Sequence, residues 1–283
     1  MKLISTIALS AAVMACSASP ETQGTSEVTK SQQSELSTIS QFTISYTATG
    51  NYYIGYGMNR ISDLCVPTGY SGEFNFESVS LDADANNNYF VNAQVNVGGS
   101  YTHRYGVSCV PRSSVADTGG QGLAAWHGNT WGEAYNGHTS DSTALPTSYP
   151  AGHQLCLMTG IAGITANNRD LSQILYQSNQ IYTQTSYHSD LIRSTAGTCD
   201  EFASPISLGT FGSVYTANGS VQYIATPYNQ LCAVTEVAGD VQINSAPAQY
   251  WWSALGPNRG LYVFSSDNGA TWPWVQVRCL ALY

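Results

Sequence analysis

One short phrase occurs three times in the chain, and it constrains the fold more than any other feature of the sequence. The copies begin at Leu64, Leu155 and Leu231, and each reads Leu-Cys-x-x-Thr-x-x-(Ala/Ser)-Gly. In each copy a second cysteine follows the first at nearly the same distance along the chain. Self-similarity at a fixed period is the mark of a repeat architecture, so the sequence predicts three tandem units of about 68 residues each.

Apolar residues inside these units alternate with polar ones. Phe42, Ile44 and Tyr46 do so in the first unit, and Val275 and Val277 do so in the third. A period of two is typical of strands, and the low charged fraction of 10% together with 19 tyrosines suits pleated, half-buried surfaces. We therefore predict an all-β fold of three tandem, disulfide-clipped antiparallel β units. Such units must cover their apolar faces, and packing with pseudo-threefold symmetry is one arrangement that does so.

The N-terminus has the pattern of an export signal. Residues 1–15 join a lysine to an apolar stretch that is too short to span a bilayer. The residues before Cys16 resemble a bacterial lipobox, and this resemblance implies that Cys16 is the acylated first residue of the mature protein. In such lipoproteins Ser17 favours the outer membrane. Ordinary signal cleavage near Ala18, which would remove Cys16, is the alternative.

Composition divides the rest of the chain. After Cys16 the sequence is rich in Ser, Thr, Gln and Glu and nearly free of apolar residues, which predicts a flexible tether. The predicted organisation is a signal peptide at 1–15, a lipid-anchored tether at 16–39, β repeats at 40–110, 130–200 and 210–283, and connectors at 111–129 and 201–209.

Six of the seven cysteines fall in the repeats, and Cys16 is the odd one. Export into an oxidising compartment lets cysteines pair, although sequence alone does not select the connectivity. If each unit folds as its neighbours do, the pairs are Cys65 with Cys109, Cys156 with Cys199, and Cys232 with Cys279. In the chain-entropy model each bridge stabilises the fold by about 4 kcal/mol.

Charge and motif content argue against several classes of function. The formal net charge is −9 and the nine Lys and Arg residues are scattered, which argues against nucleic-acid binding. The five histidines show no metal-ligand spacing, and no cysteine is spare for zinc. No P-loop or dinucleotide fingerprint appears, so we predict no cofactor. The predicted membrane contact is the acyl anchor alone.

Two local motifs predict turns. The first resembles the Asp box of sialidases and other β-propellers, where it is a structural hairpin; its fixed positions are Ser265, Asp267, Gly269, Thr271 and Trp272. The second, at residues 82–86, begins like a calcium loop. Asn87 and Ala93 then stand where such a loop needs glycine and glutamate, so we interpret it as a polar turn.

Aromatic residues are the best candidates for ligand binding. Trp251, Trp252 and Trp126, with His127 beside the last, could form a stacking platform for sugars, since aromatic faces offer a large contact area at low ordering cost. Adjacent strand residues point to opposite faces, so one of Trp251 and Trp252 is expected to be exposed. Packing within the sheets is the alternative role. A catalytic group assembled from His127, Glu133 and Ser140 is the other hypothesis considered; we assign no catalytic residue.

With glycine after the threonine in its first two copies, the repeated phrase resembles a repeat of exported proteins from myxobacteria and their relatives. The resemblance implies an exported, disulfide-clipped β repeat and carries no catalytic residue across. The leading hypothesis is a cell-envelope lipoprotein with a non-catalytic binding or adhesion role, for a glycan or another envelope protein. The alternatives are a secreted polysaccharide-active hydrolase and a structural surface component.

Overall fold

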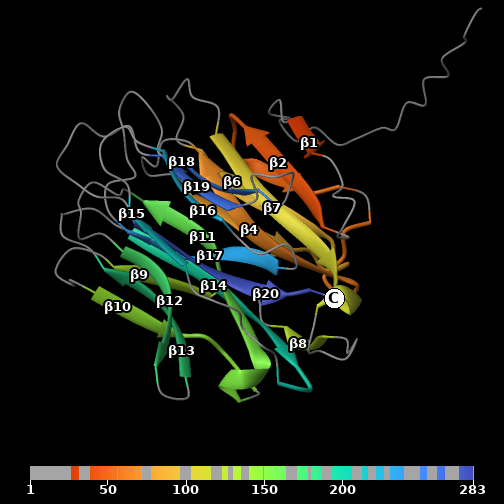
Figure 1. Ribbon diagram of the computed structural model, residues 1–283, viewed down its shortest axis with the longest axis vertical. Coiled ribbons are helices and arrows are strands. Elements are labelled where there is room, and N and C mark those ends of the chain that lie inside the picture. Colours follow the sequence, from red (N-terminus) through yellow and green to blue (C-terminus); the bar gives the residue numbers. More distant parts are fainter. Residues whose placement is uncertain are drawn as a thin grey trace, which may run out of the picture.

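The fold was analysed in a computed structural model of the chain (Figure 1). The structure describes residues 27–31, 39–55, 57–71, 78–95, 103–115, 123–126, 130–134, 140–148, 150–163, 171–177, 180–186, 193–205, 212–215, 221–225, 230–238, 249–253, 260–264 and 274–282. These residues form antiparallel strands and two short 3-10 turns, η1 (Arg112–Ser114) and η2 (Ala151–His153), and no α-helix. The prediction of an all-β chain is confirmed.

The first sheet joins strands from both ends of the chain. Its order is β1 (Glu27–Ser31), β2 (Ser40–Tyr46), β7 (His103–Pro111), β4 (Asp63–Ser71), β18 (Gln249–Ser253), β19 (Gly260–Phe264) and β16 (Val221–Ala225). Figure 1 shows β18 and β19 beside the much earlier β4 and β7. The junction is the pairing of β18 with β4, in which Gln249 lies opposite Ser71.

The other two sheets follow a similar order. The second is β10 (Ser140–Ala144), β13 (Gln180–Ser186), β12 (Leu171–Gln177), β17 (Gln230–Ala238), β20 (Trp274–Ala281) and β15 (Gly212–Tyr215). The third is β3 (Gly50–Tyr53), β6 (Tyr89–Gln94), β5 (Ser78–Ala83), β11 (Gln154–Gly163), β14 (Arg193–Phe202) and β8 (Leu123–Trp126), with β9 (Thr130–Ala134) also paired to β14. The strands of residues 40–110 are thus divided between the first sheet and the third, which a small sheet for each unit would not give.

The repeated phrase forms the central strands β4, β11 and β17. In each of them the pairing with the neighbouring strand shifts by one residue at the threonine of the phrase: Thr68, Thr159 and Thr235. An extra residue on one strand of an antiparallel pair is a β-bulge, which bends the strand and increases its twist. All three threonines are buried. The repeated threonine therefore marks the point at which the register of each central strand shifts.

The cysteines of each phrase lie directly opposite their partners on the neighbouring strand. The structure contains disulfides between Cys65 and Cys109, Cys156 and Cys199, and Cys232 and Cys279, which are the pairs that the repeat predicts. Their Cα atoms are 4.0 to 4.1 Å apart, which is closer than in a hydrogen-bonded antiparallel pair. Each bridge therefore joins two neighbouring strands at a non-hydrogen-bonded position.

One hydrophobic core lies between the sheets. It contains all six bridged cysteines and apolar residues from strands of every sheet, such as Ile44, Leu155 and Leu231. A hydrogen bond 2.7 Å long links two sheets inside this core, because the hydroxyl of Tyr105 on β7 donates to the carbonyl of Thr159 on β11. The described residues therefore share a single core.

Two segments depart from the predicted boundaries. Glu27–Ser31, which we expected in the flexible tether, forms the edge strand β1 and pairs with β2. An edge strand pairs through its backbone N–H and C=O groups. A strand can therefore form there even though the sequence after Cys16 is nearly free of apolar side chains, which was the ground for predicting a tether. Leu123–Trp126, which we expected in a connector, forms β8 and pairs with β14. The signal peptide and Cys16 lie outside the described residues.

Candidate functional site

The outer face of the strand pair β3–β6 carries an exposed aromatic pair, and β6 is also the second strand of the β5–β6 hairpin. Tyr53 on β3 is 51% exposed, and Tyr53 and Ile61 are the two large hydrophobic side chains exposed among the described residues. Tyr53 lies opposite Phe90 on β6, with ring centroids 5.7 Å apart and ring planes inclined by 50°. Cross-strand aromatic pairs stabilise sheets, and where a ring is exposed its apolar face is also available to a ligand.

Two side-chain amides extend this aromatic surface. Asn51 precedes Tyr53 by two residues on β3, and Asn92 follows Phe90 by two on β6, so that the two asparagines lie opposite each other. Residues two apart on a strand share a face. Neither amide has a hydrogen-bond partner within the described part of the chain. We call Asn51, Tyr53, Phe90 and Asn92 the hairpin patch; it combines aromatic faces with amide donors and acceptors.

The opposite face of the strand pair β3–β6 holds the patch in place. Tyr52 and Val91 alternate with the patch residues and are buried in the core. The Tyr52 ring stacks on Tyr46 at 5.8 Å, and its hydroxyl donates to the carbonyl of Ala48 over 2.5 Å. Burial raises the pKa of the Tyr52 hydroxyl, although its bond to Ala48 opposes the shift. The strands that carry the patch are therefore held in place by buried side chains on their other face.

A turn at the end of the hairpin holds a carboxylate against the patch. Asp84 accepts backbone hydrogen bonds from Asn86 at 2.9 Å and Asn88 at 2.8 Å, and its second oxygen is 3.3 Å from the Tyr53 hydroxyl. The backbone N–H of Asn88 is the main reason that the pKa of Asp84 lies below its ordinary value. Asn87 has a φ of 67°, in the left-handed region that asparagine tolerates. Both Asp84 oxygens face protein donors, which fits the predicted polar turn.

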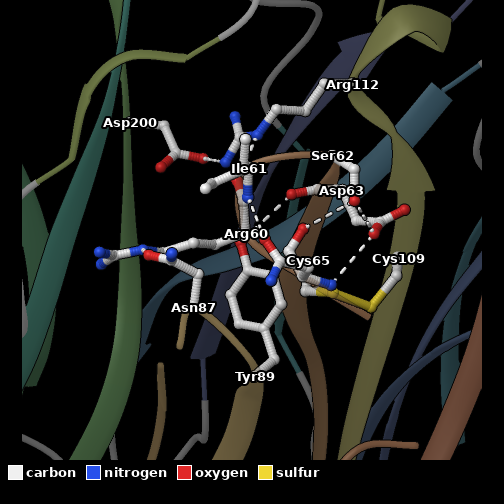
Figure 2. A network of polar contacts seen from close by, with 11 residues as sticks. Arg60, Ile61, Ser62, Asp63, Cys65, Asn87, Tyr89, Cys109, Arg112 and Asp200 are labelled. Atoms are coloured by element: carbon white, nitrogen blue, oxygen red, sulfur yellow. Dashed lines mark hydrogen bonds and ion pairs between the residues drawn. A yellow bond between two sulfur atoms is a disulfide. The ribbon is translucent and has the colours of Figure 1, made fainter. Parts of the chain in front are cut away.

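A second turn supports the first (Figure 2). Arg60 donates its backbone N–H to the carbonyl of Asn87 at 2.9 Å and its Nε to the Asn87 side chain at 2.6 Å. Asn59 donates its side-chain amide to the carbonyl of Asn86 at 3.1 Å. The two turns therefore form one polar network at the end of the hairpin.

The same network contains a buried ion pair between distant parts of the chain (Figure 2). Arg112 Nη2 lies 2.9 Å from Asp200 Oδ2, and the two side chains are 3% and 5% exposed. Arg112 Nε donates to the carbonyl of Arg60 at 2.7 Å. Burial disfavours the charged guanidinium, but the Asp200 carboxylate and Tyr89 outweigh it and raise the pKa of Arg112. Burial, followed by the negative charge of Asp200, raises the pKa of Tyr89. The pair connects η1 to β14.

This ion pair replaces apolar residues of the other repeats. Arg112 stands three residues after its closing cysteine, where the other copies have Phe202 and Leu282. Asp200 directly follows its cysteine, where the other copies have Val110 and Leu280. Within the described part of the chain, Asp200 Oδ1 and Arg112 Nη1 have no hydrogen-bond partner. We interpret the pair as a structural contact, because both groups are inaccessible to a ligand.

The predicted aromatic candidates are placed in different sheets. Trp251 and Trp252 belong to β18 in the first sheet, where Trp251 lies opposite Gly69 on β4 and Tyr262 on β19. Trp126 belongs to β8 in the third sheet and lies opposite Asp200. The structure therefore does not gather the tryptophans into one strand pair, and His127 lies outside the described residues.

The remaining candidates are only partly described. Glu133 lies on β9 and Ser140 begins β10. The Asp-box residues Ser265, Asp267, Gly269, Thr271 and Trp272 lie outside the described residues. The part of the chain that the structure describes contains no group of three or more His, Cys, Asp or Glu side chains that could hold a metal ion. Within that same part, no helix has the length and apolar character needed to cross a membrane.

Sequence reasoning missed the hairpin patch. The segment from Gly50 to Tyr53 is short and ends in two adjacent tyrosines, so its alternation is hard to read. The available signal was Tyr89-Phe90-Val91-Asn92, in which Phe90 and Asn92 alternate with Tyr89 and Val91, as on a strand with one buried face. Comparison with known proteins adds no further candidate, since we found no protein-family model and no curated protein that matches the sequence.

Proposed function

We propose that the protein is a non-catalytic glycan-binding protein of the bacterial cell envelope, and that the hairpin patch is a binding surface. The observation that carries this proposal is the half-exposed Tyr53 ring beside Phe90, with two amides on the same face that have no hydrogen-bond partner among the described residues. Aromatic faces stack on the apolar faces of sugar rings, and amides can both donate to and accept from hydroxyl groups.

Charge favours a neutral glycan at this surface. Asp84 contacts the Tyr53 hydroxyl, and Asp82 on β5 lies opposite Phe90 on β6. The whole chain carries a formal net charge of −9. Like charges repel, so polymers that bear carboxylates or sulfates would meet an unfavourable field. The proposed ligands are therefore uncharged glycans.

A glycan array with the folded protein, followed by calorimetric titration of the best neutral ligand, tests the proposal. We expect Tyr53→Ala to weaken binding at least tenfold, because it removes the most exposed stacking ring. Asn51→Ala should weaken binding less, and Tyr53→Phe should retain most of it. Ile61→Ala is the matched control, since Ile61 is 61% exposed and lies outside the patch. Equal affinities for Tyr53→Ala and the unaltered protein would refute the assignment.

We also propose that Cys16 carries the lipid that holds the protein at the envelope. The lipobox-like residues before Cys16, the polar stretch after it and the resemblance to exported myxobacterial proteins support this proposal. Metabolic labelling with an alkyne fatty acid should mark the unaltered protein and not Cys16→Ser. Labelling of both proteins would contradict the anchor.

The finer architecture is part of the same proposal: three units related by pseudo-threefold symmetry. The cyclic order of strands supports it, because one strand of each bridged pair continues into a strand of another unit: β4 pairs with β18, β17 with β12, and β11 with β5. A crystal structure tests the symmetry directly. The three bridged strand pairs should superpose after rotations close to one third of a turn.

A further inference from the structure

A carboxylate borders the aromatic pair of the hairpin patch. Asp82 on β5 lies opposite Phe90 on β6, and Phe90 lies opposite Tyr53 on β3, so the three residues form one register row across three neighbouring strands. Directly opposed residues of an antiparallel pair share a face of the sheet. Asp82 therefore lies on the face that carries the patch, and all three side chains are at least partly exposed.

The next row of the same strands supports this assignment of faces. Leu81, Val91 and Tyr52 each stand one residue along the strand from a member of the first row, and all three are buried in the core. Successive residues of a strand lie on opposite faces. The row that contains Asp82 therefore belongs to the face that is turned away from the core.

Phe90 lies between Tyr53 on one neighbouring strand and Asp82 on the other. The Tyr53 ring is held towards the turn, because its hydroxyl donates to Asp84 Oδ2 at 3.3 Å. Asp82 Oδ1 accepts the backbone N–H of Ala83 at 2.8 Å, which orients the carboxylate. A carboxylate offers about four acceptor positions on its two oxygens, more than this one bond uses. Asp82 can therefore accept further hydrogen bonds beside the aromatic pair.

We propose that Asp82 selects the ligand of the hairpin patch by accepting hydrogen bonds from two adjacent hydroxyl groups of one sugar ring. Neighbouring strands lie about 4.8 Å apart, so a sugar ring stacked on Phe90 and Tyr53 brings the hydroxyl groups at its edge to β5. A hydrogen bond to an ionised acceptor is about twice as strong as a neutral one. The preferred ligand is an uncharged sugar with two free neighbouring hydroxyl groups at that edge.

This inference rests on the proposed glycan-binding function and names the part of the sugar that the site distinguishes. The amides of Asn51 and Asn92 can both donate and accept, so they tolerate a hydroxyl group or an ether oxygen. An ionised carboxylate only accepts. Asp82 therefore disfavours a sugar whose edge hydroxyl groups are methylated, acetylated or absent, because such a ring has no proton to donate there.

Nuclear magnetic resonance titration with the methyl glycosides of glucose, galactose and mannose provides the test. The glycoside that binds most tightly is then compared with its monodeoxy derivatives. We expect loss of either of two adjacent hydroxyl groups to weaken binding to the unaltered protein about tenfold, as for a hydrogen bond to a charged group.

Asp82→Asn keeps an acceptor for the Ala83 N–H but removes the charge. It should weaken binding of the parent glycoside about fivefold, and it should bind the two affected deoxy derivatives no worse than the unaltered protein does. Asp63→Asn is the matched control. It removes the same charge from a carboxylate that accepts the backbone N–H of Asn59 outside the patch, and it should leave the affinities unchanged.

The outcomes separate the two proposals. If neither the glycosides nor any arrayed glycan binds, the proposed function itself is wrong. If Tyr53→Ala weakens binding but Asp82→Asn does not, only the role of Asp82 is refuted. Equal weakening of the parent and all deoxy derivatives by Asp82→Asn, or equal weakening by Asp63→Asn, would also refute that role. If larger glycans bind while no methyl glycoside does, recognition of a single sugar ring is wrong.

Discussion

The buried ion pair between Arg112 and Asp200 allows a quantitative test of how the fold is held together. The two side chains are 3% and 5% exposed and meet at 2.9 Å, while Arg112 Nη1 and Asp200 Oδ1 have no hydrogen-bond partner among the residues that the structure describes. Removing one member leaves a buried, uncompensated charge, which costs about 3–5 kcal/mol. We therefore expect Arg112→Leu and Asp200→Leu each to lower the free energy of unfolding by that amount.

The double variant gives the opposite expectation. The third repeat carries leucine at both equivalent positions, Leu282 for Arg112 and Leu280 for Asp200, so apolar residues suit the site. Replacing a buried ion pair by apolar residues of similar volume is often neutral, or stabilising by about 1–4 kcal/mol. The double variant R112L/D200L should therefore be at least about as stable as the unaltered protein, with a coupling energy that exceeds either single loss.

Equilibrium urea unfolding with the disulfides intact measures the free energy of unfolding of the four proteins in this double-mutant cycle: the unaltered protein, the two single variants and the double variant. Fluorescence and circular dichroism must give coincident transitions for the comparison to hold. The reasoning is refuted if the single variants lose less than about 1 kcal/mol, or if the double variant loses the sum of the single losses. Either result would mean that the pair is solvated or that its partners lie elsewhere.

Three further predictions concern single residues. Gly160→Ala should cost about 1–3 kcal/mol in urea unfolding, because a Cβ there would lie 2.6 Å from the backbone oxygen of Val79, whereas Gly152→Ala, which meets nothing within 4 Å, should change stability little. The pKa of Asp84 is lower in the folded state, so the ionised carboxylate stabilises the fold above the ordinary value of 3.8, and this stabilisation is lost as the pH falls through the folded pKa. On acid titration Asp84→Asn should therefore lose less stability than the unaltered protein. Equal losses of stability would contradict the hydrogen bonds assigned to Asp84. The pKa of Tyr89 is higher in the folded state, so its contribution to stability is complete below the ordinary value of 10.0 and is lost as the pH rises above it. When thermal unfolding is followed against pH, Tyr89→Phe should therefore remain stable at higher pH than the unaltered protein. Unchanged sensitivity to alkaline pH would argue against the burial of Tyr89.

Sequence reasoning succeeded where the repeat itself carries the information. The alternation of Phe42, Ile44 and Tyr46 predicts a strand, and β2 (Ser40–Tyr46) forms there. The cysteine pairing follows from the same repeat, because equal units require equal bridges. The threonine of the phrase was visible as a repeat, but its role as the bulged residue was not, since register is a property of two strands together.

Strand partners could not be predicted in the same way. Apolar alternation shows that Val79 and Leu81 lie on a strand, but not that this strand pairs with β11 from the next repeat. Gly160 lies directly opposite Ser80 and is required there because the two backbones approach closely. A glycine in a strand pattern indicates such an approach without naming the partner. The hairpin patch was missed for a related reason, because β3 contributes only four residues.

The first sheet combines strands from both ends of the chain, and this determines when the protein can fold. The first sheet needs β18, β19 and β16, which are among the last segments to be synthesised, to complete an edge begun by β4. Until they arrive, β4 presents unpaired backbone groups that invite association with other chains. Pairings so distant in sequence form slowly, because the entropy of closing a long loop is lost before any stabilising contact forms. Completion of this sheet therefore waits for the end of synthesis, and the bridge between Cys65 and Cys109 can hold the waiting strands together meanwhile.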